Sequence, residues 1–285
     1  QHLRALKETA YGVTNLMSAM KLMQVNPEDT LAGLPFNDKG VELIDQAILK
    51  KEQMQKKVHD LHEVNPMLGH RGVRLGLSYP EIYRMQIRAI LEAAAECQKV
   101  HIDVRPEIMV PQVCTAEELV RVKQYVEEIA ASVEKEKGIR PVFKFGTMIE
   151  VVRACMEADQ LATQAAFFSF GTNDLTQATF SFSREDAENK FLPLYTEKDI
   201  LHDNPFEVLD TKGVGKLMQI AVEWGRKTNP DLKIGICGEH GGQPDSIRFC
   251  HQLGLTYVSC SSPRVPVARL AAAHAKLGEA KQGSL

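Results

Sequence analysis

The sequence lacks several features that would place it in a specialised class. No two of its six cysteines form a CxxC pair, which excludes a zinc ribbon and a thioredoxin-type redox site. No apolar run approaches the roughly 18 residues that a membrane span needs, so no membrane partner is expected. A formal net charge of −3 leaves no basic excess for a nucleic-acid partner. There is no signal-peptide pattern, and the chain begins at Gln1, so we expect a fragment or a processed form with free thiols in a reducing compartment.

What the sequence does contain is a regular alternation of helical and extended patterns. From residue 69 onward, strand and helix patterns follow one another at even spacing, which is typical of a parallel sheet with helical crossovers. We count six units, with strands near residues 70, 109, 145, 168, 235 and 257. A closed (β/α)8 TIM barrel needs eight. The predicted fold is therefore an α/β barrel of this type that lacks its first two strand–helix units. Residues 1–39 are predicted to be an N-terminal helical segment and linker, and residues 40–285 the barrel.

The stretch FFSFGTNDLTQ, residues 167–177, concentrates polar groups at the end of a buried strand. Phe167 begins an apolar run that suits a strand buried on both faces, and the run breaks at Gly171. Thr172, Asn173 and Asp174 follow, ahead of a short predicted helix. Free N–H groups at a helix start can bind an anion. The simpler alternative is an Asn-Asp turn whose side chains cap the helix.

Two carboxylates occupy matching positions on neighbouring strands. Glu150 follows the strand pattern FKFGTMI, and Asp174 follows FFSF. The carboxyl ends of parallel strands face one side of a barrel, so the two side chains are expected to be neighbours. Two hard oxygen donors suit Mg²⁺, which leaves positions open for substrate and water. The alternative is that each carboxylate caps the helix after it.

Three further residue types can carry chemistry. Cys237 lies between the strand pattern KIGIC and the glycine-rich loop GEHGGQP, and its thiol can exchange a proton or act as a nucleophile; the alternative is a small buried side chain. In that loop, His240 either tunes this thiol or hydrogen-bonds the backbone. Arg71, Arg74 and Arg184 can hold phosphate or carboxylate, although most arginines are simply solvated.

These motifs together resemble a known family. In chain order they are VNPMLGHRG (64–72), GTMIE (146–150), FFSFGTNDLTQ (167–177), GICGEHGG (235–242) and YVSCS (257–261). They resemble the C-terminal phosphoenolpyruvate/pyruvate-binding barrel of the PEP-utilising enzymes, and among these the pyruvate, phosphate dikinases in particular. The resemblance covers about residues 40–277.

The resemblance implies an enzyme that interconverts pyruvate and phosphoenolpyruvate by Mg²⁺-dependent phosphoryl transfer from or to a phosphohistidine on a separate domain. It implies that Glu150 and Asp174 bind the metal and that Cys237 is the acid/base. It also implies that the substrate is contacted by Gly171, Thr172, Asn173, Arg71 and Arg184, and by Glu150 and Asp174 themselves. It also implies a homodimer, a nucleotide-binding domain elsewhere, and a cytoplasmic, plastid or glycosomal location.

Two departures from the family pattern leave other functions open. Two motifs that carry arginines on the first two barrel strands, of the type CRTEHMF and RLLDPP, are missing, and residues 260–266 read CSSPRVP where the family usually has CSPFRVP. One alternative is a non-catalytic dimerisation scaffold, which would not need Glu150 and Asp174 together. Another is a Mg²⁺-dependent lyase for a 2-oxo acid, which would need no phosphohistidine partner.

Overall fold

A computed structural model describes residues 45, 46, 48–56 and 67–282, and side chains up to residue 278. Contacts within the chain divide it into two units, Gln1–Val64 and Asn65–Leu285. In the first unit the described residues, 45, 46 and 48–56, are helical. The predicted boundary between residues 39 and 40 and the N-terminal helical segment lie outside the described residues. The fold below is that of the second unit.

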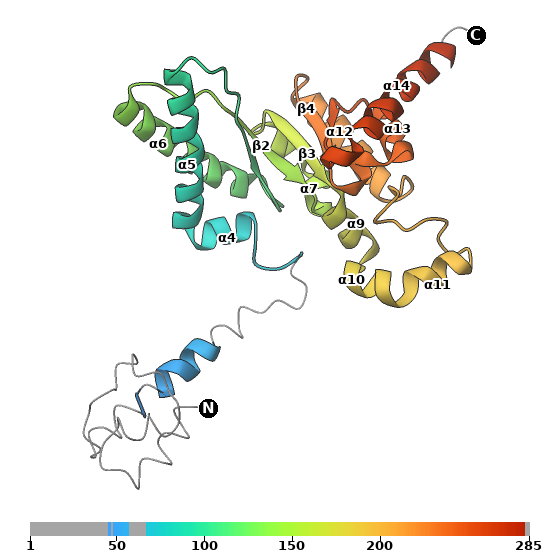
Figure 1. The fold of residues 1–285 in the computed structure, drawn as a ribbon, viewed down its shortest axis with the longest axis horizontal. Coiled ribbons are helices and arrows are strands. Elements are labelled where there is room, and N and C mark those ends of the chain that lie inside the picture. The colour runs from blue at the N-terminus through green and yellow to red at the C-terminus, as the bar shows by residue number, and fades with distance from the viewer. Residues whose placement is uncertain (1–44, 47, 57–66, 283–285) are drawn as a thin grey trace. The chain divides into compact units, whose positions relative to one another are not determined.

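The second unit is built on a parallel sheet whose five strands pair in chain order (Figure 1). They are β1 (Glu107–Val110), β2 (Lys144–Ile149), β3 (Phe167–Gly171), β4 (Lys233–Cys237) and β5 (Tyr257–Val258). Each strand pairs in parallel with the next. The α/β class and the parallel sheet predicted from the sequence are confirmed. The described residues do not close the sheet, and the eight-stranded barrel and its missing units remain predictions.

Helices connect the strands and surround the sheet. They are α4 (Val73–Ser78), α5 (Pro80–Lys99), α6 (Ala116–Lys137), α7 (Val152–Met156), α8 (Ala158–Ala162), α9 (Thr172–Phe180), α10 (Arg184–Asp186), the π-helix η1 (Ala187–Phe191), α11 (Leu192–Glu197), α12 (Val214–Thr228), the 3₁₀-helix η2 (Glu239–Gly242), α13 (Pro244–Gln252), the 3₁₀-helix η3 (Ser262–Arg264) and α14 (Val265–Gln282).

Local sequence explains where the long helix α6 begins and ends. The Thr115 hydroxyl accepts from the Glu118 N–H, and the Glu118 carboxylate accepts from the Thr115 N–H, which forms a capping box. The helix ends at Gly138, whose φ of 74° is left-handed and suits glycine. These two signals fix the ends of α6, and the apolar residues between them are buried in the core.

The outer face of the sheet carries the hydrophobic core. Ile149, Phe168 and Ile236 are fully buried, and they belong to one cluster with apolar residues of α5, α6, α8 and α12. Helix α12 packs on α8, and α6 on α5. Near the carboxyl ends of the strands, the opposite face carries Gly171 and Cys237 together with the larger Met148. Core packing therefore fixes the outer face and leaves the strand ends for polar groups.

An ion pair connects the amino ends of β1 and β4. The Lys233 ammonium, at the start of β4, lies 2.9 and 3.1 Å from the Glu107 carboxylate oxygens at the start of β1. Two strands separate β1 from β4, so these two long side chains reach across β2 and β3 to meet.

The predicted strand near residue 70 is wrong. The chain turns at Gly72, whose φ is 59°, and the Val73 N–H donates to the Pro111 carbonyl oxygen at 3.0 Å before α4 begins. The Gly76 N–H then donates to the Gly72 carbonyl oxygen. Three glycines between short apolar pieces indicated a loop followed by a strand, but the contact with Pro111 fixes a helical turn instead. The described sheet therefore has five strands where six were predicted.

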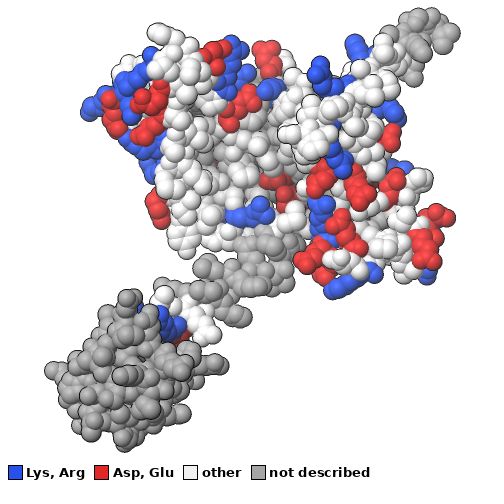
Figure 2. Space-filling view, in the orientation of Figure 1, with Lys and Arg blue, Asp and Glu red and all other residues white. Residues whose placement is uncertain are grey.

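Charged groups of both signs are interspersed on the face that Figure 2 shows. Ion pairs such as Arg84–Glu128 and Lys137–Glu96 join α5 to α6 across their exposed sides. Among the described residues, no helix is both long and apolar enough to cross a membrane.

Candidate functional site

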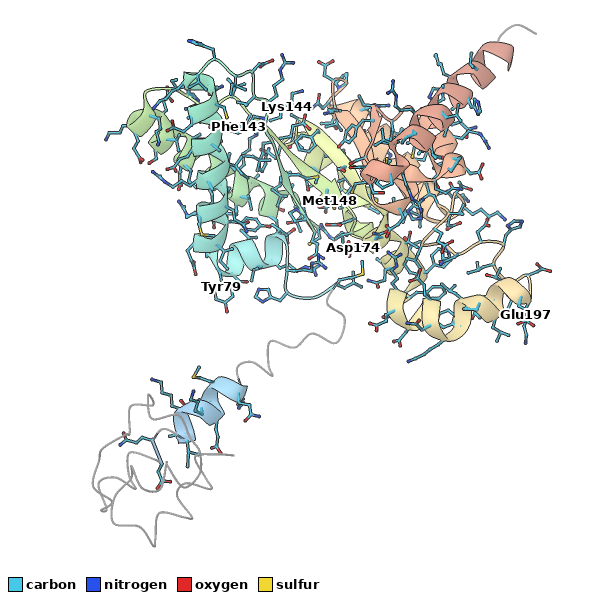
Figure 3. The ribbon with its side chains drawn as sticks, viewed as in Figure 1. Tyr79, Phe143, Lys144, Met148, Asp174 and Glu197 are labelled. Carbon is cyan, nitrogen blue, oxygen red and sulfur yellow. The ribbon has the colours of Figure 1, made fainter. Side chains whose placement is uncertain are left out.

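A cavity of about 300 Å³ lies where β2, β3 and β4 end. Most of the predicted site residues meet there, together with residues from the turns after β1 and before α4. Figure 3 labels two of the lining residues, Met148 and Asp174. The lining consists of Arg71, Gly72, Pro111, Gln112, Met148, Glu150, Gly171, Thr172, Asn173, Asp174, Cys237 and Gly238. The carboxyl ends of parallel strands are the expected place for such a site.

Gly171 allows the two predicted metal ligands to approach each other. It pairs with Cys237 across β3 and β4. A Cβ atom at residue 171 would lie 2.4 Å from Glu150 Oε2 and 2.6 Å from the Met148 sulfur. Only glycine leaves this space to the Glu150 side chain.

The alternative prediction, that Glu150 and residues 172–174 serve as helix N-caps, is wrong. Helix α9 begins at Thr172, so Thr172, Asn173 and Asp174 form its first turn, and the N-cap position belongs to Gly171 without a side-chain cap. Helix α7 has Val151 at its N-cap, also without a side-chain cap, so Glu150 does not cap it. These side chains are not used by the helix ends next to them.

Glu150, which is buried, and Asp174, which is half-buried, form a pair of like charge. Burial and then the neighbouring Asp174 raise the pKa of Glu150, and the Gln112 backbone N–H, which donates to Glu150 Oε1 at 2.6 Å, offsets part of this effect. Burial also raises the pKa of Asp174, against the lowering effects of its contact with Glu150 and the charge of Arg71. Two adjacent carboxylates cannot both ionise in a buried site unless a cation compensates them.

Several oxygen atoms of the cavity residues lack a hydrogen-bond partner. They are Gln112 Oε1, Asn173 Oδ1 and Asp174 Oδ1, all buried. Unpaired buried polar atoms are costly, and most buried polar groups in proteins are satisfied. Carboxylate and amide oxygens are the ligands that hard divalent cations prefer. The donor set therefore fits Mg²⁺. The described residues contain no group of three His, Cys, Asp or Glu side chains placed for a metal, so a cation here would take only two protein carboxylates.

Cys237 brings a thiol to the same cavity. Its sulfur lies 3.5 Å from the Phe170 carbonyl oxygen. Burial raises the pKa of this thiol, the charges of Glu150 and Asp174 raise it further, and a hydrogen bond with Ser169 acts in the opposite direction. The sulfur is therefore protonated at neutral pH and can donate a proton.

The three candidate arginines have different environments. Arg71 lines the cavity, and its charge lowers the pKa of both carboxyl groups. Arg74 donates to the carbonyl oxygens of Leu68 and Gly69 and so stabilises the loop before α4.

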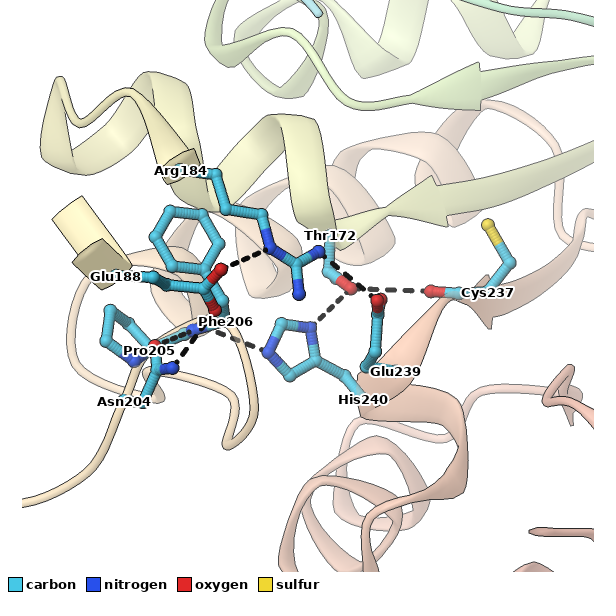
Figure 4. Close-up of polar contacts among 9 residues, drawn as sticks. All are labelled: Thr172, Arg184, Glu188, Asn204, Pro205, Phe206, Cys237, Glu239 and His240. Atoms are coloured by element: carbon cyan, nitrogen blue, oxygen red, sulfur yellow. Dashed lines mark hydrogen bonds and ion pairs between the residues drawn. The ribbon is translucent and has the colours of Figure 1, made fainter. Parts of the chain in front are cut away.

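Arg184 is outside the residues that line the cavity. Its Nε lies 3.2 Å from Glu188 Oε2, its Nη1 lies 3.2 Å from Glu239 Oε1, and its guanidinium lies over the Phe206 ring (Figure 4).

Sequence reasoning missed Gln112 and left His240 undecided. Gln112 lies two residues after the end of β1, whereas Glu150 follows β2 directly, so a strand-end rule that looked past Pro111 could have found it. The ring nitrogens of His240 contact the Thr172 hydroxyl at 2.6 Å and the Pro205 carbonyl oxygen at 3.0 Å (Figure 4). Of the two predicted roles, the backbone hydrogen bond is the one observed.

All six cysteines are free, as predicted.

Comparisons with known proteins agree with the motif-based resemblance. Pyruvate, phosphate dikinase of Entamoeba histolytica is 58% identical over 233 residues, which are 81% of this chain and 26% of that protein. The Clostridium symbiosum enzyme of the same name is 55% identical, covering 83% and 27%. Pyruvate, phosphate dikinase 1, chloroplastic, of Arabidopsis thaliana is 54% identical, covering 81% and 24%. The chain thus spans about a quarter of the length of these relatives.

A solved citrate lyase from Burkholderia xenovorans LB400 has a TM-score of 0.45 and 14% identity, covering 66% of this chain and 53% of that chain, which is too weak to assign the barrel. The family model described as the PEP-binding domain of PEP-utilising enzymes, in contrast, matches residues 35–277, most of the chain. The chain belongs to the PEP-utilising enzyme family and carries the PEP-binding domain of that family.

Proposed function

We propose that this chain is the phosphoenolpyruvate/pyruvate-binding part of a pyruvate, phosphate dikinase. In the proposed reaction, a phosphoryl group passes between a phosphohistidine on another domain and pyruvate bound in the cavity beside Glu150 and Asp174. The observation that carries the proposal is that the two carboxylates of Glu150 and Asp174 line one cavity together with amide oxygens that lack partners and the Cys237 thiol. The relatives named as pyruvate, phosphate dikinases support it.

Glu150 and Asp174 would hold Mg²⁺, with Gln112 and Asn173 supplying nearby amide oxygens. When bound, the metal would act as a Lewis acid that stabilises negative charge on the enolate and phosphoryl oxygens. The substrate would be bound by side chains and backbone N–H groups of this chain. Arg71, at the cavity wall, presents a cation to the carboxylate or phosphate of the substrate, and the free N–H groups at the start of α9 can donate to the same anion.

Cys237 is proposed to move the proton at the methyl carbon of pyruvate. A thiol whose pKa is raised by burial holds its proton at neutral pH, which suits donation to the enolate carbon when phosphoenolpyruvate becomes pyruvate. In the reverse direction the thiolate must form first. The thiol would lose its proton to water, and a cation bound between Glu150 and Asp174 would favour that ionisation, because it would offset the two negative charges that raise the pKa of Cys237.

Proton exchange tests the role of Cys237 without the absent domains. Pyruvate in D₂O with Mg²⁺ should lose its methyl protons by NMR faster in the presence of the chain. Cys237→Ala should abolish this catalysis, whereas Cys250→Ala, a change at a buried thiol on α13, should retain it in folded protein. Equal exchange by Cys237→Ala and the wild type would remove Cys237 from the proposed role.

The resemblance also leads us to propose that the protein is a homodimer. We further propose that it works with a phosphohistidine domain and a nucleotide-binding domain of the full-length enzyme. Sedimentation velocity of the chain tests the first point. A monomer at micromolar concentration would contradict a dimer formed by this part alone.

A further inference from the structure

His240 is a buried polar side chain that the proposed reaction does not use. It belongs to η2, directly after the loop that follows Cys237, and its relative exposure is 0%. Burial of an imidazole requires partners for both ring nitrogens. Those partners come from two other segments, because one is the Thr172 hydroxyl at the start of α9 and the other is the Pro205 carbonyl oxygen.

The partners determine which nitrogen carries the proton. A carbonyl oxygen can only accept, so Nε2 must donate to Pro205. In a neutral ring Nδ1 is then an acceptor, and the Thr172 hydroxyl must donate to it. Burial lowers the pKa of His240, which favours this neutral form.

The geometry at Thr172 agrees with that assignment. Its oxygen lies 2.6 Å from His240 Nδ1 but 3.4 Å from the Cys237 carbonyl oxygen (Figure 4). A hydroxyl has one proton, and the 3.4 Å contact is longer than a usual hydrogen bond, whereas the contact with His240 Nδ1 is short. A doubly protonated ring would instead force the Thr172 proton toward Cys237, at the longer distance.

We propose that His240 is a positioning residue: protonated at Nε2, it accepts the Thr172 hydroxyl proton and holds the first turn of α9 against the backbone at Pro205. That turn contains Asn173 and Asp174, so the imidazole sets where these two side chains meet the cavity. The consequence for ligand binding rests on the proposed function, but the hydrogen-bond assignment does not.

Two substitutions separate the two hydrogen bonds of the ring. The amide of His240→Asn falls near the position of Nδ1 and can still accept from Thr172, whereas the amide of His240→Gln reaches the position of Nε2 and can still donate to Pro205. His202→Asn, at a histidine whose side chain is 96% exposed, is the matched control.

Two readouts apply to the 285-residue chain. Long-range ¹H–¹⁵N spectra of the wild-type imidazole should show protonation at Nε2 only. The backbone amide shifts of residues 172–174 should stay near wild type in His240→Asn and move in His240→Gln. Binding of oxalate with Mg²⁺ should weaken about tenfold or more in His240→Gln and less than about threefold in His240→Asn, in line with the loss of groups that orient metal ligands.

An Nδ1-protonated or doubly protonated ring would overturn the proposal, as would equal effects of the two substitutions on residues 172–174. If the wild-type chain binds no oxalate with Mg²⁺, the proposed function fails for this chain. The imidazole spectrum, which needs no variant, and the amide shifts still decide the role of His240 in that case.

Discussion

The two ends of the sheet differ in how their charged side chains are paired. At the amino ends of the strands, a cavity of about 630 Å³ contains two pairs of opposite charge, Asp103–Arg105 and Glu107–Lys233. At the carboxyl ends, a cavity of about 300 Å³ contains two adjacent carboxylates and oxygen atoms without partners. Both linings include a buried oxygen without a partner, Gln98 Oε1 in the larger cavity and Asp174 Oδ1 in the smaller one, so unpaired atoms alone do not distinguish them. The difference is that the larger cavity contains carboxylates paired with cations, whereas the smaller one contains two carboxylates next to each other. Two neighbouring carboxylates therefore mark the proposed functional end better than cavity size does.

The largest expected effect is a loss of cation affinity. Only substitutions at the carboxyl ends of the strands should cause it. Asp174→Asn removes a carboxylate charge from the proposed metal site, so Mg²⁺ or Mn²⁺ affinity measured by calorimetry should fall on the order of 100-fold. Glu107→Gln, at the opposite end of the same sheet, should leave that affinity unchanged. Equal losses in the two variants would mean that the difference between the ends has no functional meaning.

The next effect is on stability, at the glycine that makes room for Glu150. Gly171→Ala places a Cβ against Glu150 and Met148, and overpacking of this kind typically costs about 1–3 kcal/mol. Gly278→Ala on α14 meets nothing within 4 Å and should be neutral or stabilise the helix by up to about 1 kcal/mol. Urea unfolding of both variants checks the prediction. A Gly171→Ala protein as stable as wild type would show that the Glu150 side chain moves aside freely.

A smaller effect concerns pH and the buried His240. Its pKa is lowered in the folded protein by burial, whereas the unfolded chain takes up a proton below about pH 6.5. The unfolded state therefore binds more protons in acid, and this contribution to stability is present above that pH and is lost as the pH falls. Between pH 7.5 and 5.5, the urea midpoint should drop more in wild type than in His240→Asn. His202→Asn should keep the wild-type drop, and a His240→Asn protein with the same drop would contradict the prediction.

The smallest effect is expected at the paired end of the sheet. Glu107 and Lys233 are each about one-third exposed, and the ammonium also lies 4.7 Å from the Tyr257 ring centroid. Partly solvated ion pairs contribute little, so Lys233→Met should change the free energy of unfolding by at most about 1 kcal/mol. A loss of several kcal/mol would contradict this prediction and would mean that the contact contributes far more than its exposure indicates.

The strand ends were predictable from sequence because each depends on a local pattern. An apolar run marks each buried strand, and Glu150, Asp174 and Cys237 lie at or within three residues of the strand ends. The structure brings these three residues to one cavity. The capping box of α6 is a local signal of the same kind.

Features that depend on distant contacts were not predictable. Helix α4 replaces the expected strand because the Val73 N–H meets the Pro111 carbonyl, 38 residues away in sequence. The partners of Arg184 and His240 come from segments that periodicity does not connect, since Glu239 and Thr172 lie 55 and 68 residues from them. Sequence alone therefore suggested these side chains but could not assign their contacts.

The most direct test of the account is calorimetric binding of oxalate, a planar dianion that mimics the enolate of pyruvate. We predict that the wild-type chain binds oxalate only with Mg²⁺, that Glu150→Ala abolishes this binding, and that Glu107→Ala retains it. Absence of binding at millimolar oxalate in a chain shown to be folded would contradict the account and favour a structural role for this part of the protein. Binding that persists without Mg²⁺ or in Glu150→Ala would contradict the assignment of the carboxylate pair as the metal site.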